Sequence, residues 1–161
     1  MLNFKKLFIS YPKTFVMTYL ERMEYWGDHH HPKYLDILRI ATGVFLILKG
    51  IDFASNTSSL INIVSGQVPF TEFVNVMLVH FIIFAHIFGG FLIAMGLLTR
   101  VASLVQIPIL LGAMIFVNWQ MLDYFAGFWL AMLTLIAVIV FTIVGSGPWS
   151  VDRAIEEKRL Q

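Results

Sequence analysis

The chain has 161 residues, of which 58% are hydrophobic and 13% are charged, and its formal net charge at pH 7 is +1. Soluble domains carry about a quarter charged residues and less than half apolar ones, so this composition predicts a membrane protein. The nearly neutral charge gives no reason to expect a nucleic-acid partner. Because there is no cysteine, disulfides, thiolate metal sites and thiol redox chemistry within the chain are excluded.

Residues 1–36 are expected to form an N-terminal arm rather than a signal peptide, because charged residues interrupt its apolar runs. The stretch "FVMTYLERMEYW" places Phe15, Tyr19, Met23 and Trp26 near one face of a helix. This pattern predicts an amphipathic helix on the cytoplasmic surface of a membrane, with a docking surface for a soluble partner as the alternative. The "DHHHP" stretch is interpreted as a solvated, pH-sensitive linker rather than a metal site, since its three successive histidines diverge.

Four apolar segments are long enough to cross a bilayer, which takes roughly 20 residues in a helix. They cover residues 37–54, 73–98, 101–119 and 125–144. A tight turn at Thr99–Arg100 is expected between the second and third segments. Pro108 is expected to kink the third, because proline lacks a backbone N–H.

Basic residues gather at one side of these segments. Five precede the first segment, three follow the last, and Arg100 lies between the second and third. Because basic loops stay in the cytoplasm, both termini are predicted to be cytoplasmic, an arrangement that four spans satisfy.

The expected fold class is therefore all-α, an integral membrane four-helix bundle with an N-terminal interfacial amphipathic helix. Its parts are a cytoplasmic and interfacial arm (1–36), the four-helix bundle (37–146) and a cytoplasmic tail (147–161).

Small residues suggest how the first two spans pack. In the second span, His86, Gly90 and Ala94 form one stripe at helical spacing, and the first span has a glycine-bearing face that includes Arg39. Small residues four apart let transmembrane helices approach closely. We predict that these two faces pack together, and the small residues assigned to this contact are Gly43, Gly50, Gly89, Gly90 and Ala94.

Ionisable side chains within the spans mark a candidate polar site, because such groups usually face the interior of a bundle. We expect a polar pocket that opens away from the cytoplasm, of the class used by quinones or protons. The alternatives are that His86 is a structural hydrogen-bonding group and that Lys49 extends to the outer surface. The candidate residues are Arg39, Lys49, His80 and His86.

No metal site is predicted. His80 and His86 are six residues apart, about 120° around a helix, so they cannot hold one metal ion or one haem together. The other three spans contain no histidine that could complete a haem site.

The stretches "RIATGVFLILKG" and "GGFLIAMGLLTR" in the first two spans resemble the DoxX family of four-helix bacterial inner-membrane proteins. "GSGPWSVDR" is similar to the closing signature of that family, in which Gly147 and Pro148 end the last helix. The resemblance covers about residues 35–155 and leaves out the N-terminal arm.

The resemblance implies a multi-pass protein of the bacterial inner (plasma) membrane that is linked to respiratory or redox enzymes. One relative is the membrane subunit of a thiosulfate:quinone oxidoreductase. The chain departs from the family pattern in two places. His86 stands near the usual position of a glutamate, and Lys49 stands where a histidine is often found. A carboxylate and an imidazole titrate in different pH ranges, so a proton-handling role does not transfer directly.

The predicted function is an accessory or quinone-facing membrane subunit of a redox complex. Without cysteine, a haem pair or a nucleotide motif, the chain would depend on a protein partner that carries the redox centre, and whether it is itself an enzyme stays open. The expected ligand is a quinone, and the expected partners are the lipid bilayer, this redox protein and a second copy of the chain. A non-catalytic membrane anchor, an assembly partner and a small transporter are the alternatives.

Overall fold

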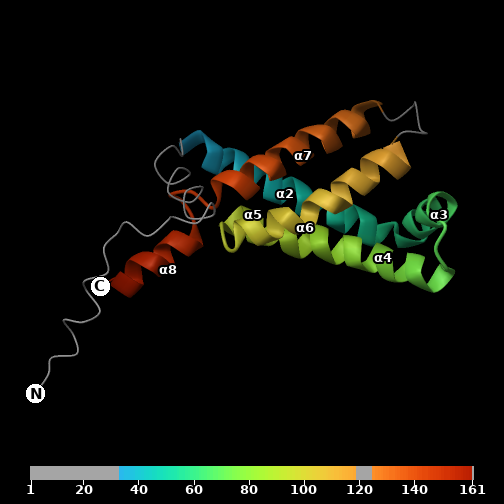
Figure 1. Cartoon of the computed structure of the whole chain (residues 1–161), viewed down its shortest axis with the longest axis horizontal. Helices are drawn as coiled ribbons and strands as arrows, with labels where there is room; N and C mark the ends of the chain where they lie inside the picture. The colour runs from blue at the N-terminus through green and yellow to red at the C-terminus, as the bar shows by residue number, and fades with distance from the viewer. Residues whose placement is uncertain (1–32, 119–124, 161) are drawn as a thin grey trace, which may run out of the picture.

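The computed structural model describes residues 33–118 and 125–160, and within these ranges it contains helices and no strand. The predicted amphipathic helix of the N-terminal arm and the histidine run lie outside the described residues. The long helices lie side by side, with α3 at one end of the molecule and α8 at the other (Figure 1). The elements, with η for a π-helical segment, are α2 (Lys33–Ser55), α3 (Thr57–Gln67), α4 (Glu72–Phe84), η2 (Ala85–Gly89), α5 (Gly90–Met95), α6 (Thr99–Gly112), η3 (Ala113–Asn118), α7 (Phe125–Val144) and α8 (Val151–Leu160).

The outer surface of the helices is apolar, whereas much of the interior is polar. Phe73, Phe84 and Phe91, along α4 and α5, are each at least 50% exposed. Among the described residues, ten polar or charged side chains are buried, as many as the buried hydrophobic ones. Soluble proteins rarely bury charged groups and rarely expose large apolar patches, so this surface is suited to contact with lipid.

Two helical runs have the length and apolar composition of a membrane span. They are Glu72–Met95 and Gly127–Val144, and only 33% and 22% of their most apolar windows are buried. The core helix of a soluble protein would be mostly buried. At ~1.5 Å per residue, the 23 residues of α2 extend about 35 Å, but three charged residues interrupt its apolar part. The four-span topology therefore stays a prediction.

The connection between α5 and α6 is a glycine-terminated helix end. Gly96 has a φ of 68°, and the N–H groups of Gly96 and Leu97 bond back to α5 carbonyls at 3.2 and 2.9 Å. This is a Schellman motif, which glycine favours because it has no Cβ to clash in the left-handed conformation. The turn predicted at Thr99–Arg100 was misplaced, since both residues already belong to α6.

Close backbone contact joins α2 to α5. A Cβ atom on Gly43 would lie 2.5 Å from the nitrogen of Ala94 and 2.6 Å from the oxygen of Gly90. Gly89 has a different neighbour, because a Cβ there would lie 2.7 Å from Nε2 of Gln106 on α6. Small residues thus bring both α2 and α6 close to the helical run that contains η2.

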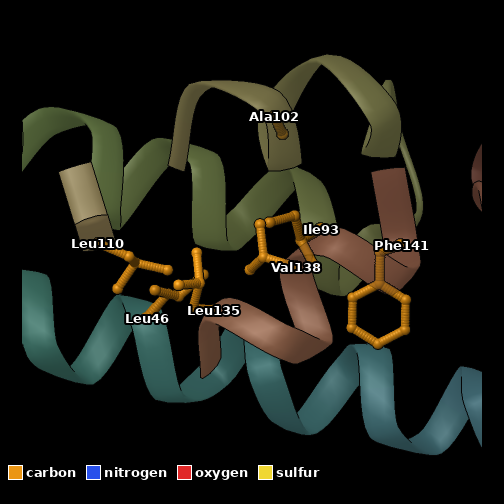
Figure 2. Packing of buried hydrophobic residues seen from close by; sticks show 7 residues of the cluster. All are labelled: Leu46, Ile93, Ala102, Leu110, Leu135, Val138 and Phe141. Atoms are coloured by element: carbon orange, nitrogen blue, oxygen red, sulfur yellow. The ribbon is translucent and has the colours of Figure 1, made fainter. Parts of the chain in front are cut away.

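A small apolar core ties α7 to the other helices (Figure 2). Its members are each at most 8% exposed, and close van der Waals packing of this kind holds helices together where lipid surrounds them. They are Leu46 from α2, Ile93 from α5, Ala102 and Leu110 from α6, and Leu135, Val138 and Phe141 from α7.

We expect Gly43→Ala to destabilise the protein by about 1–3 kcal/mol, the usual result of overpacking, because the added methyl group would meet backbone atoms. Gly112→Ala is the control. Apart from the nearby backbone of its own helix, no described atom lies within 4 Å of its Cβ position, and alanine favours a helix over glycine by about 1 kcal/mol. Thermal unfolding in detergent, followed by circular dichroism, measures both variants. Equal stability of the two would contradict the close contact at Gly43.

Candidate functional site

The four predicted site residues lie in separate surroundings. Arg39 is fully buried where α5 turns into α6, a part of the molecule that we call the Arg39 end. His86 is buried on η2 against α2, Lys49 is half-exposed on α2, and His80 is exposed on α4. The structure therefore does not bring Arg39 together with the other three.

A buried ion pair organises the Arg39 end. The side chains of Arg39 and Asp36 are both 0% exposed, with 3.6 Å between Nη2 and Oδ1. Arg39 also donates hydrogen bonds to the carbonyl of Ser146 and, at 2.7 Å, to the carbonyl of Trp149. The N–H of Trp149 donates back to Asp36 Oδ2 at 3.3 Å. The pair thus holds the loop between α7 and α8 against the first turns of α2.

Asp152 fixes the start of α8 to the α5–α6 turn. Its Oδ2 accepts the N–H of Leu98 at 3.0 Å, and its own N–H donates to the carbonyl of Gly96 at 3.2 Å. Leu98 has a φ of 48°, a conformation that costs about 1–3 kcal/mol in a residue other than glycine. Ser150 caps α8 by accepting the N–H of Arg153 at 3.3 Å.

The arrangement at the Arg39 end is suited to holding backbone rather than to chemistry. The planar guanidinium of arginine bonds two acceptors at once, and here its acceptors are two carbonyls of one loop. Asp36 was not among the predicted residues. Its position three residues before Arg39 on one helix is the sequence signal that indicates the pair.

His86 lies in the π-helical segment η2 and is 5% exposed. Its Nδ1 lies 3.0 Å from the carbonyl oxygen of Ile82. Because a carbonyl only accepts, Nδ1 carries the hydrogen, and Nε2 of the neutral imidazole is left as an acceptor. The ring of Phe53 on α2 contacts the imidazole edge-on, with 5.4 Å between centroids. Gly50 allows this contact, since a Cβ there would lie 3.1 Å from His86 Cβ.

Gln106 of α6 also contacts the segment η2. Its side chain is 0% exposed, and its Nε2 donates to the carbonyl of Ala85 at 2.5 Å. π-Helical segments frequently occur at functional sites. Gln106 was not among the predicted site residues, which are all ionisable. Polar residues spaced four and three apart within an apolar span, as at Thr99, Ser103 and Gln106, are the signal that indicates a buried polar face.

Lys49 and His80 are accessible from outside. Lys49 pairs with Asp52 at 3.6 Å, with side-chain exposures of 45% and 55%. Lys49 is one helical turn before Phe53, so it flanks the contact between α2 and His86. The Nδ1 of His80 bonds a carbonyl of its own helix at 2.8 Å. Within the two described ranges, no three His, Cys, Asp or Glu side chains are grouped so as to hold a metal ion.

Arg39→Met should lower the free energy of unfolding by about 3–5 kcal/mol, because it leaves the carboxylate of Asp36 buried without its partner. Lys49→Met is a matched control, since its ion pair has the same i,i+3 spacing and the same 3.6 Å distance. That pair is half-exposed, so its loss should lower the free energy of unfolding by at most about 1 kcal/mol. Unfolding by SDS in mixed micelles measures both. If Arg39→Met lowers the free energy of unfolding no more than Lys49→Met does, the ion pair does not hold the Arg39 end.

Comparison with known proteins places the chain in a family. The family model DoxX matches residues 34–119, more than half of the chain, which confirms the resemblance of the first two spans. The matched region runs from α2 into η3 and contains all four predicted site residues, whereas α7 and the loop that binds Arg39 lie beyond it. No curated protein and no solved structure gives a significant match. The chain belongs to the DoxX family of membrane proteins.

Proposed function

We propose that this protein is an accessory, quinone-facing subunit of a redox complex in the bacterial inner membrane. The observation that supports the proposal is the imidazole of His86, which is 5% exposed in the interior of the bundle. Its Nδ1 is bonded to the carbonyl of Ile82 in its own helix. An imidazole has two ring nitrogens and the helix carbonyl engages one of them, so we infer that a ligand bonds to the other, Nε2.

The direction of that bond indicates the chemistry of the ligand. Since Nε2 accepts, its partner must donate, and the phenolic hydroxyl of a reduced quinone is such a donor. A quinone carbonyl only accepts, so it would require the other imidazole tautomer or the imidazolium. The ring of Phe53 beside His86 offers an aromatic wall for the quinone ring. Lys49, one turn before Phe53 on α2, is a half-exposed cation beside the proposed site.

The proposed complex includes a second protein. The chain contains no cysteine, so it can hold no thiolate-ligated iron–sulfur cluster and no thiol redox couple. A partner would therefore bring the redox centre that exchanges electrons with the quinone. Arg100 and the basic residues of α8 follow the positive-inside rule if the Arg39 end faces the cytoplasm, and we orient the protein in that way.

A non-catalytic membrane anchor is the second candidate function, and the Arg39 end favours it. The charged groups there bind backbone atoms of the loop between α7 and α8. Polar contacts of this kind fix how helices pack. In an anchor, His86 would have the same purely structural role.

Quinone analysis of the protein extracted from native membranes in mild detergent tests the proposal. We expect mass spectrometry to find quinone in near-stoichiometric amount with the unaltered protein. The His86→Leu variant should retain about tenfold less quinone. A hydrogen bond between groups within a membrane is worth about 1–2 kcal/mol, and 1.4 kcal/mol corresponds to a tenfold change in affinity.

His80→Leu is the matched control, since it makes the same change on the same helical run at an exposed site. It should leave the quinone content unchanged. Equal loss of quinone from both variants would contradict a site at His86. A protein partner that co-purifies without any quinone would favour the anchor.

A further inference from the structure

Buried polar groups form one face of α6. Thr99, Ser103 and Gln106 succeed one another at intervals of four and three residues, and they are 1%, 0% and 0% exposed. Within the described part of the chain, Thr99 Oγ1, Ser103 Oγ and Gln106 Oε1 have no hydrogen-bond partner. Three such oxygens on one face are unusual, because most buried polar atoms in proteins are paired.

Three buried or partly buried hydroxyl groups elsewhere in the helices are satisfied locally. Thr42, Thr134 and Thr142 each donate to the carbonyl four residues earlier, at 2.8, 2.7 and 2.9 Å. This back-bonding is the usual solution for a hydroxyl in an apolar helix. Ser103 has the same option in the carbonyl of Thr99 but does not use it. Its hydroxyl is therefore free to bind another group inside the bundle.

The polar face connects the two clusters described above. It extends about 10 Å along α6, at ~1.5 Å per residue. At one end, Thr99 follows the turn at Gly96, where the guanidinium of Arg39 lies and its Nε is also unpaired. At the other end, Gln106 bonds the carbonyl of the residue before His86.

We propose that this face of α6 binds ordered water inside the bundle, in a seam that runs from the Gly96 turn to η2. Buried waters typically make about three hydrogen bonds to groups that would otherwise be unsatisfied. The hydroxyls of Thr99 and Ser103 both donate and accept, and Gln106 Oε1 accepts, so water suits all three. These side chains are uncharged, which favours water over an ion as the ligand.

The seam gives protons a hydrogen-bonded route between the Arg39 end and the segment that carries His86. Its existence does not depend on quinone binding, because it rests on unpaired atoms of α6 alone.

Water-edited solid-state NMR of labelled protein in lipid tests the seam directly, since magnetisation passes from water only to nearby protein sites. We expect the side-chain signals of Ser103 and Gln106 to build up as fast as that of Glu72, an exposed charged residue at the start of α4. Thr134 is the internal control, because it is 7% exposed but bonded to its own helix, and it should build up slowly. If the signal transferred from water builds up as slowly at Ser103 as at Thr134, the proposal is overturned.

Stability provides an independent measurement. If water binds Ser103, Ser103→Ala breaks hydrogen bonds and should raise the equilibrium constant for unfolding about tenfold. Thr134→Val, which removes a hydroxyl satisfied within its own helix, should change the constant by less than about threefold. If Ser103→Ala leaves stability unchanged or increases it, the hydroxyl is truly unpaired and the seam is dry, which overturns the proposal.

Discussion

A helix bundle whose outer surface faces hydrocarbon must satisfy its polar groups internally, because lipid offers them no hydrogen bonds. This constraint explains why the protein buries as many polar side chains as apolar ones among its described residues. It also explains why these side chains gather where helices approach most closely. The contact of Gly43 with Gly90 and Ala94 brings the backbones of α2 and α5 together, and the polar groups on either side of this contact are sheltered from lipid as a result.

The interior polar groups have two distinct arrangements. At the Arg39 end, Arg39, Asp36 and Asp152 all bind backbone atoms, so their charges close the end of the bundle and hold the loop before α8. Along α6 and at η2, the polar face of Ser103 and Gln106 lies beside the segment that carries His86, and both side chains are uncharged and retain oxygens that are unpaired among the described residues. The first arrangement is suited to stability, and the second can accept a ligand or water.

Local features of the sequence were sufficient to predict much of the fold. The spans predicted at residues 37–54, 73–98 and 125–144 correspond closely to α2, α4–α5 and α7, because length and apolar composition are properties of the segments themselves. The turn between α5 and α6 was misplaced, since its position depends on which residue adopts the left-handed conformation, and Gly96 does so. The membrane class and the DoxX family were also accessible from composition and from short motifs.

The sequence by itself determined that the protein is helical, apolar on the outside and a member of the DoxX family. Only the tertiary structure decided which polar residues meet. Arg39 is bound by a loop 107 to 110 residues further along the chain, so it does not join Lys49, although both lie on α2. Likewise, Gln106 reaches η2 across 21 residues. Helical periodicity assigns a residue to a face of its own helix, but the partner of that face depends on how the helices pack, and this is a property of the whole chain.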